Sequence, residues 1–275
     1  MAMSRTRVHL VTGGFPPGAT AAHDIDFARR QLLQALSEIQ GARVTVASDF
    51  ADLERWLPQC QVLVTYVAGP VLTDDQCEAV EAWLDDGGRW LAFHGTSGGK
   101  AERVDGNALV RRMVRSRHHE VLGAFFLNHP PLRRFSVDVA APEHPLTAGI
   151  PASFEVADEL YLLEVDRARV EVLLTTCFDE DPSPPGFGFQ YERDTSPLED
   201  GRTRAVATQR AVGKGGVIYI ALGHCHDAAS NSQPFVDTSI EPDGKTPKTF
   251  RGVWEDDTFR RLLENGLNWA ARTNH

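Results

Sequence analysis

The sequence has no long apolar run and no excess of positive charge. Over its 275 residues, no uninterrupted apolar stretch approaches the roughly 20 residues of a membrane-spanning helix. The apolar run 8–12 near the N-terminus is too short for the core of a signal peptide. Lysine and arginine number 28 against 38 acidic residues, a net charge of −10, whereas nucleic-acid-binding proteins carry clustered basic residues. We therefore expect neither a membrane nor a nucleic acid as a partner.

Cysteine is also scarce, and the usual nucleotide-binding motifs are missing. The four cysteines show neither CxxC spacing nor the density of a disulfide framework, so we expect reduced, mostly buried thiols in a cytoplasmic protein. The glycine-rich loop 13–18 does not have the pattern GxGxxG, and no Walker lysine follows it. No nucleotide cofactor is therefore expected.

What the first hundred residues do contain is an alternation of apolar and amphipathic segments. The predicted strands are 8–12, 43–47, 61–67 and a run ending at Phe93. The predicted helices are 24–39, 50–57 and a segment whose first residues, Thr73 to Gln76, form a capping box. This alternation predicts an α/β fold with a parallel, doubly wound sheet and right-handed crossovers.

The remaining residues predict mainly further strands and long loops. Residues 133–139 alternate apolar and polar side chains, as in a half-exposed antiparallel strand. A basic helical segment is expected over 107–117. Further strands are predicted at 170–176, 203–209 and 216–222, a loop over 179–200 and a closing helix over 256–271. We expect one domain, 1–275, with a long loop insertion at 228–253, and loops of that length are usually lids, binding loops or disordered.

Two predicted strands end in a histidine. The run Leu91–Gly99 passes from an apolar strand to His94, and a later strand ends in Gly223–His224. In open α/β sheets ligands lie outside the carboxyl ends of the strands, so both histidines are candidates for a cleft. The alternative for His94 is a plain strand-to-turn junction with a hydrogen-bonded core histidine.

Other polar residues have weaker patterns. The segment 118–130 holds three histidines and a glutamate, but its spacing is not HExxH, and the adjacent His118 and His119 would point apart. His23, which precedes a predicted helix, is expected to be solvated. Ser97 lacks the GxSxG flanks of a nucleophile, so we expect it to cap the backbone instead.

An ordered series of short motifs runs through the whole chain. It consists of Phe93-His94-Gly95, Glu120-Val121-Leu122-Gly123, Phe126, His129-Pro130, His144-Pro145-Leu146, Gly149-Ile150-Pro151, Asp158-Glu159-Leu160-Tyr161, Gly223-His224 and Gly266-Leu267-Asn268-Trp269-Ala270. In this series the chain resembles the ThuA-like (trehalose utilisation) family. The resemblance implies a flavodoxin-like, class I glutamine amidotransferase-like three-layer α/β sandwich, with a mostly parallel sheet and antiparallel additions.

The sequence departs from class I amidotransferases at the central strand. Those enzymes carry a cysteine in a GxCxG elbow, where a strained turn presents an activated thiolate. His94 stands at that place and no cysteine is near, which excludes glutaminase chemistry. The loop 228–253 looks longer than is usual for the family, and we expect it to overhang the site.

The resemblance also implies a set of site residues. Histidines at strand ends with a carboxylate beside them suit proton transfer near neutral pH. On an extended chain only one of the adjacent Asp158 and Glu159 can face the cleft, so the other is expected to be solvated. The expected catalytic residues are His94, Glu120, Asp158 and His224. The expected substrate-binding residues are His129, His144, Glu159, Tyr161 and Trp254. A divalent metal, if one is used, has His94, Glu120, His129 and His224 as candidate ligands.

Three functions remain open from the sequence. The first is an enzyme acting on a sugar, such as trehalose, a keto-disaccharide or a related glycoside, by acid/base isomerisation or hydrolysis. The second is a non-catalytic sugar-binding or regulatory module, in which Trp254, Phe235 and Tyr161 stack on sugar rings. The third is thiol chemistry at Cys225, beside two histidines. His129 and His144 each precede a proline and could instead tie loops. The partner expected is a small-molecule sugar, and a homo-oligomer is left open.

Overall fold

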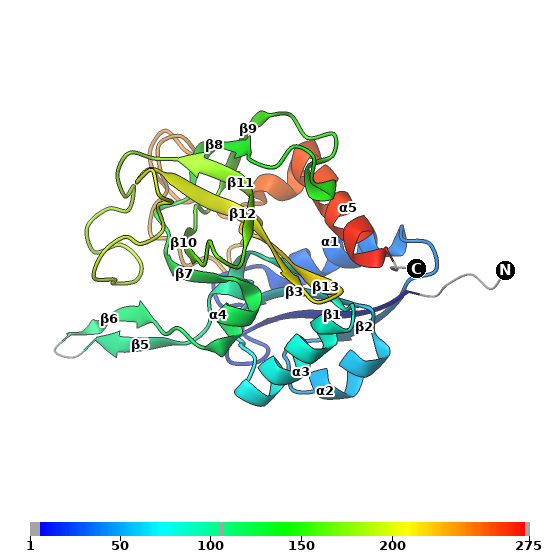
Figure 1. Cartoon of the computed structure of the whole chain (residues 1–275). Helices are drawn as coiled ribbons and strands as arrows, with labels where there is room; N and C mark the ends of the chain where they lie inside the picture. The colour runs from blue at the N-terminus through cyan, green and yellow to red at the C-terminus, as the bar shows by residue number, and fades with distance from the viewer. Residues whose placement is uncertain (1–5, 105–106, 273–275) are drawn as a thin grey trace.

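A computed structural model describes residues 6–104 and 107–272, and most of its strands belong to one mixed sheet (Figure 1). Within those ranges nine strands lie in the order β2-β1-β3-β4-β13-β12-β11-β8-β9. The parallel part comprises β2 (Arg43–Ala47), β1 (Arg7–Gly14), β3 (Val62–Ala68), β4 (Arg89–Phe93) and β13 (Gly215–Ile220). The antiparallel part adds β12 (Thr203–Val212), β11 (Glu171–Cys177), β8 (Arg133–Val139) and β9 (Ser153–Asp158). The expected α/β sandwich is confirmed, and its antiparallel part has four strands against five in the parallel part.

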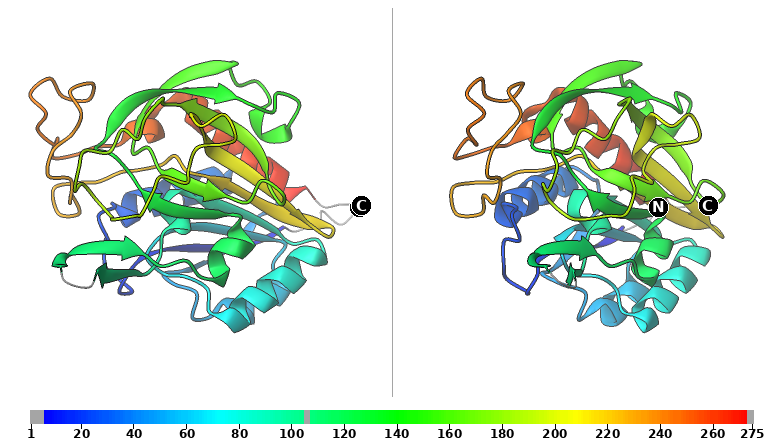
Figure 2. Two further views of the ribbon diagram at one scale, coloured as in Figure 1. Left: turned by 60° about the vertical axis from the view of Figure 1, so that its left-hand side comes forward. Right: turned by 90° about the vertical axis from the view of Figure 1, so that its left-hand side faces the viewer.

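Helices cover both faces of the parallel half (Figure 2). The elements on one face are α1 (Ile25–Ser37) and α5 (Asp257–Ala271), and those on the other are α2 (Leu53–Trp56), the 3₁₀ turn η1 (Leu57–Gln59) and α3 (Asp74–Asp85). Each face has its own apolar core. The three layers follow from the strand pattern, because a strand that is apolar on both sides needs a cover on each side.

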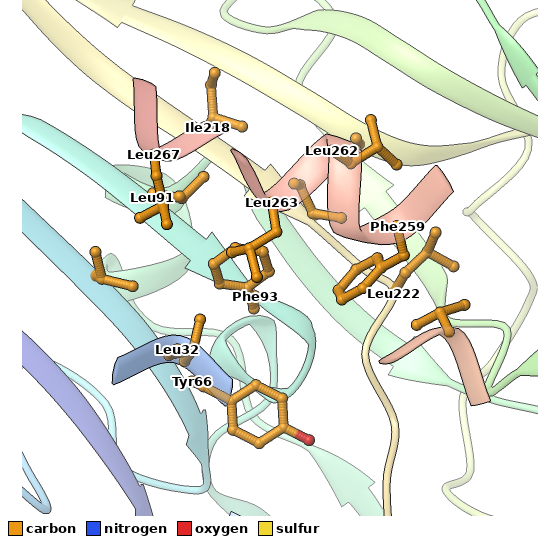
Figure 3. Close-up of a cluster of buried hydrophobic side chains, with 14 of the residues drawn as sticks. Leu32, Tyr66, Leu91, Phe93, Ile218, Leu222, Phe259, Leu262, Leu263 and Leu267 are labelled. Atoms are coloured by element: carbon orange, nitrogen blue, oxygen red, sulfur yellow. The ribbon is translucent and has the colours of Figure 1, made fainter. Parts of the chain in front are cut away.

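The strand β4 illustrates how the sequence divides between the two cores. Successive side chains of a strand point to opposite faces, so Leu91 and Phe93 pack towards α1 and α5 while Trp90 and Ala92 pack towards α3. Figure 3 shows Phe93 between Leu263 of α5 and the α1 side of this core. The burial of β4 on both faces fixes where its last residue, and so the following His94, must lie.

The helix starts agree with the capping residues. The side chain of Asp24 accepts a hydrogen bond from the backbone N–H of Phe27 and begins α1. Both hydrogen bonds of the Thr73–Gln76 capping box are present at the start of α3. Such caps satisfy backbone N–H groups that the helix itself leaves unpaired. The helix expected over 256–271 is α5, capped by Asp256.

The prediction of a helix over 107–117 is wrong. Residues Asn107–Met113 form strand β6, which pairs with β5 (Ala101–Val104) as an antiparallel hairpin. The hairpin places Arg112 of β6 beside Glu102 of β5 at 2.7 Å. The helix of this region is the short α4 (Arg117–Leu122).

A second small sheet and two long loops lie beside the main sheet. Strands β7 (Ala124–Asn128) and β10 (Leu162–Val165) pair antiparallel. The loop after β11 covers 178–202, and the loop after β13 covers 221–251; between them they contain only isolated β-bridges. Figure 2 shows the second loop, in orange, projecting from the molecule. The remaining 3₁₀ turns are η2 (His94–Ser97), η3 (Pro145–Thr147) and η4 (Gly252–Glu255). No helix among the described residues is long and apolar enough to cross a membrane.

Candidate active site

Four side chains from separate segments meet at the carboxyl end of the parallel strands. His94 directly follows β4, His224 follows β13, Glu159 directly follows β9, and His23 precedes α1. One ligand atom from each lies within 4.8 Å of the others. All four side chains are buried, and the most exposed of them, His23, is 7% exposed. We call these four residues the histidine–glutamate cluster.

The backbone at the end of β4 turns His94 towards the cluster. His94 has φ 44°, a left-handed conformation that is uncommon for a residue other than glycine. Its Nδ1 lies 2.7 Å from the carbonyl oxygen of Ala221. A carbonyl oxygen only accepts, so Nδ1 carries the hydrogen and the lone pair of Nε2 points at Glu159 Oε2, 3.4 Å away. The ring of Tyr161 stacks on the imidazole with centroids 4.3 Å apart.

His23 is oriented by the same kind of contact. Its Nδ1 lies 2.7 Å from the carbonyl oxygen of Ala21, which leaves Nε2 free of hydrogen. Burial, together with the neighbouring His94 and His224, holds the pKa of His23 well below its usual range. The expectation that His23 is solvated is wrong. The loop from β1 folds back across the sheet end and buries the ring 4.9 Å from those of both other histidines.

His224 is held through a second histidine that the sequence analysis did not single out for the site. His226 Nε2 lies 2.9 Å from the carbonyl oxygen of Pro247, so that nitrogen donates and His226 Nδ1 accepts. His224 Nε2 then donates to His226 Nδ1 at 3.0 Å. The remaining lone pair, on His224 Nδ1, faces Glu159 Oε2 at 3.3 Å. The spacing of two residues on extended chain, which places both side chains on one side, was the available signal.

The two carboxylate oxygens of Glu159 contact different groups. Oε2 faces His94 and His224, as described, whereas Oε1 lies 3.2 Å from His129 Nδ1 and accepts a hydrogen bond from Gln233 Nε2. Burial alone would raise the pKa of Glu159, but the adjacent His129 and His224 outweigh it and hold the pKa well below its usual range. The charged carboxylate of Glu159 thus lies between the cluster histidines on one side and His129 and Gln233 on the other.

Asp158 is buried and faces backbone rather than solvent. Its carboxylate accepts hydrogen bonds from the backbone N–H groups of Gly223, His224 and Glu159, at 2.7, 2.9 and 2.7 Å. Burial raises its pKa to about 6. The expectation that one of the two adjacent carboxylates is solvated is therefore wrong. Asp158 ties the end of β13 to the end of β9, and this fixes the positions of two cluster residues.

A groove of about 470 Å³ lies beside Glu159. His129 and Gln233, the two partners of Glu159 Oε1, line it. Its walls come from the two long loops, through residues 184–189 and 232–235, and from Arg111. The rings of Phe187 and Phe235 meet across it with centroids 5.3 Å apart. Loop 228–253 therefore does overhang the site.

Six of the expected site residues lie outside the cluster. Asp158, His129 and Tyr161 contact its members, as described above, and the other three are placed as follows. Glu120 is exposed on α4, because the buried side of that short helix is taken by His118 and His119. His144 bonds Gln209 and the backbone N–H of Leu146, and so ties a loop. Trp254 is buried and donates to the carbonyl oxygen of Gly223 at 2.8 Å. The structure thus gives His144 and Trp254 structural contacts and leaves Glu120 in solvent.

The nucleophiles considered from the sequence are also engaged elsewhere. Ser97 Oγ is buried and lies 2.7 Å from the hydroxyl of Tyr219. Burial raises the pKa of the Cys225 thiol to about 12, so the thiolate that nucleophilic chemistry requires is not formed near neutral pH. Neither side chain belongs to the cluster. The chemistry available here is that of imidazole, carboxylate and any cation they hold.

Fold and site together define an α/β sandwich with a buried histidine–glutamate cluster at the carboxyl edge of its sheet. The family model described as ThuA, trehalose utilisation, matches residues 18–238. The chain belongs to this family.

Several solved structures have a similar fold. A ThuA-like protein from Bacteroides uniformis is 21% identical with a TM-score of 0.60, over 98% of this chain and 93% of that one. Another from Parabacteroides merdae is 15% identical with a TM-score of 0.57, over 98% and 90%. A cytoplasmic protein from Salmonella typhimurium is 12% identical with a TM-score of 0.53, over 97% and 100%. No curated protein matches the chain.

Proposed function

We propose that this protein is an enzyme that transfers protons on a carbohydrate bound in the groove beside Glu159. The observation that carries the proposal is the pairing of His129 with Glu159 at the wall of that groove. His129 is 16% exposed, whereas Glu159 is 3% exposed. Membership of a trehalose utilisation family favours a sugar as the substrate.

The hydrogen bonds of His129 make it suited to act as a base. Its Nδ1 lies 2.9 Å from the carbonyl oxygen of Pro130 and 3.2 Å from Glu159 Oε1. Both neighbours are acceptors, so Nδ1 carries the hydrogen and Nε2 keeps its lone pair. A carboxylate behind an imidazole fixes its tautomer and stabilises the imidazolium that forms when the base takes a proton.

Two reactions fit such a base. With a keto-sugar, His129 would remove a proton from the hydroxyl-bearing carbon next to the carbonyl and give an enediolate. A shift of the hydroxyl proton to the former carbonyl oxygen, and return of the proton from His129 to the former carbonyl carbon, would complete an isomerisation. With a glycoside, the same base would take a proton from a water that attacks the anomeric carbon while the glycosidic C–O bond breaks. Return of that proton from His129 to the departing sugar oxygen would complete the hydrolysis. Trehalose would supply a glycosidic bond for hydrolysis, and a keto-disaccharide would supply either a glycosidic bond or a carbonyl group for isomerisation. The walls of the groove favour a ring-shaped, amphipathic ligand, because the faces of Phe187 and Phe235 offer apolar contact to sugar C–H groups.

The proposal is tested by a turnover screen of trehalose, keto-disaccharides and related glycosides. For the substrate found, we expect His129→Gln to lower kcat by about 10²- to 10⁴-fold, the usual worth of a positioned base. His144→Gln is the matched control, because that histidine lies in a loop outside the cluster. Equal turnover by the two variants would remove His129 from the reaction.

A non-catalytic sugar-binding module is the second candidate. The observation in its favour is the burial of the whole cluster, with exposed fractions of 7% or less. This alternative predicts that sugars bind in the groove and are recovered unchanged. Detection of any product that depends on His129 would exclude it.

Location and partners follow from the same proposal. A small-molecule sugar is the partner that the groove favours, and the net charge of −10 argues against nucleic acid. We also propose a cytoplasmic location, as expected from the reduced thiols.

A further inference from the structure

Three buried nitrogen atoms of the histidine–glutamate cluster have no hydrogen-bond partner. They are His23 Nε2, His94 Nε2 and His224 Nδ1. Buried polar atoms are nearly always hydrogen-bonded, and each exception calls for an explanation. Here the three exceptions come from three segments of the chain and converge on one carboxylate.

A proton does not account for this arrangement. The opposite nitrogen of each ring donates to a fixed acceptor, namely Ala21 O, Ala221 O or His226 Nδ1. All three inward nitrogens therefore present lone pairs, and Glu159 adds only acceptor oxygens. A single proton would bond one nitrogen to the carboxylate and leave the other two unpaired. A cation at the centre satisfies all four groups at once.

We infer that the cluster binds one divalent first-row transition metal ion through His23, His94, His224 and Glu159. Donor atoms within 4.8 Å of one another need only side-chain shifts of a few tenths of an ångström to surround a single ion at metal–ligand distances of ~2.0–2.2 Å. Imidazole and carboxylate donors suit zinc, manganese, iron or cobalt. Calcium and magnesium prefer sites made almost wholly of oxygen, and one glutamate does not provide that.

The surroundings are those of a constructed metal site. Metal-binding histidines commonly donate their other N–H to a carbonyl or another side chain, which fixes the ring and its tautomer. All three histidines do so here. Asp158 holds the backbone of both Glu159 and His224 in place. Of the candidate ligands predicted from the sequence, His94 and His224 belong to the cluster and Glu120 and His129 do not. His23 and Glu159 complete the cluster instead.

Binding of the ion does not depend on the sugar, but its use in catalysis rests on the proposed function. A bound ion acts as a Lewis acid towards a carbonyl or hydroxyl oxygen. Glu159 Oε1 meanwhile remains in contact with His129 and Gln233 of the groove. The ion and the base would thus lie on opposite sides of one carboxylate.

The test is metal binding by the whole chain, measured without substrate. Protein stripped with a chelator and then dialysed is titrated with Zn²⁺ and with Co²⁺, by calorimetry and by the visible spectrum of Co²⁺. We expect one equivalent of either ion, with Co²⁺ absorption typical of nitrogen ligation. Loss of an outer-shell partner can weaken metal binding by up to about 100-fold. Both His23→Ala and Glu159→Gln remove a direct ligand, so we expect each to weaken binding by at least that factor.

The controls are His144→Gln and Glu120→Gln, which remove one histidine and one carboxylate outside the cluster and should bind as the wild type does. Glu159→Gln keeps the shape of the side chain, and a circular dichroism spectrum of each variant establishes that it is folded. Failure of the wild type to bind either ion would overturn the inference, and so would wild-type affinity in folded Glu159→Gln. Metal binding without sugar turnover would leave the metal centre standing and reject the proposed function. Turnover by protein that binds no metal would leave the proposed function standing and overturn the metal centre.

Discussion

At the scale of single residues, the site depends on which atom of each side chain is already bonded. His94 and His224 were predicted from the sequence because each follows an apolar strand, and the carboxyl end of such a strand is where ligands lie. His23 was not predicted as a site residue, because its position depends on a glycine- and proline-rich loop folding back over the sheet end. Tautomers also depend on contacts with carbonyl groups distant in sequence, such as Ala221 O for His94. Residue types could thus be predicted here, but lone-pair directions could not.

Asp158→Asn tests the role of this carboxylate in joining two strand ends. An amide has one acceptor oxygen and one N–H donor group, so one of the backbone N–H groups of Gly223 or His224 would face a donor instead of an acceptor. Leaving a buried donor unsatisfied costs about 1–3 kcal/mol. We expect the free energy of unfolding in urea to fall by that amount. The exposed Asp138 of β8 supplies the control Asp138→Asn, which should change stability by less than about 0.5 kcal/mol.

At the scale of elements, α4 is attached to the segments that follow β3 and β4 through His118, and this histidine must remain neutral. His118 Nδ1 accepts from the backbone N–H of Leu72 at 3.2 Å, and Nε2 lies 2.8 Å from the carbonyl oxygen of Thr96. Burial, and the nearby His119, lower the pKa of His118 from 6.5 to about 3. Protonation would turn the acceptor nitrogen into a donor that faces another donor.

Stability should therefore fall on acidification below pH 6.5. Between pH 6.5 and about 3 the unfolded chain takes up the proton and the folded chain does not, so this histidine costs about 1.4 kcal/mol per pH unit over that window. Above pH 6.5 both states are neutral and the contribution is complete. Urea midpoints measured from pH 7 to pH 4 check this, and His118→Gln should have the shallower slope. Parallel slopes for the two proteins would contradict the assignment.

The groove loop is held by Asn128 at the end of β7. Asn128 Oδ1 accepts from the backbone N–H of Phe189, and its Nδ2 donates to the carbonyl oxygen of Phe187. Gly188, with φ +72°, lies between them, and a Cβ there would come within 2.1 Å of Asn128 Oδ1. An alanine at 188 must therefore displace the loop that carries Phe187.

We expect Gly188→Ala to weaken sugar binding by about tenfold or more, the effect of losing ~1.4 kcal/mol of contact. Gly186→Ala is a matched control, because Gly186 also has positive φ, +77°, but has open space around its Cβ position. Dissociation constants of the two variants, with limited proteolysis of the loop, separate backbone strain from the clash. The same affinity in both would show that the clash does not matter for binding.

At the scale of the whole molecule, the sequence predicted the parallel half better than the antiparallel half. Strands β1, β3 and β4 are buried on both faces, so they form continuous apolar runs between helices that carry clear caps. The hairpin β5–β6 has no such pattern, and the basic residues of 107–117 suggested a helix. The groove depends on two long loops whose path is set by contacts such as Phe187 with Phe235. No local period encodes contacts of that kind.

A metal centre built from distant segments couples the ion to the whole fold. The four ligands come from positions 23, 94, 159 and 224, and the unfolded chain does not hold them together. An ion that binds only the folded state stabilises it by about 2.7 kcal/mol at a free concentration of 100 times Kd. At the same ion concentration we expect Zn²⁺ to raise the free energy of unfolding by that amount in the wild type and by at most about 0.4 kcal/mol in Glu159→Gln, whose Kd is at least about 100-fold higher. Urea titrations with and without the ion measure the difference.

The position of β13 has a consequence for synthesis of the chain. This strand of six residues pairs with β4 on one side and with β12 on the other, and so joins the two halves of the sheet. It is also the last strand of the sheet to leave the ribosome. Until residue 220 has emerged, the nascent protein has two partial sheets with unpaired inner edges, which are sites for pairing with other chains. Chaperone protection during translation is therefore most valuable for the first four-fifths of this polypeptide.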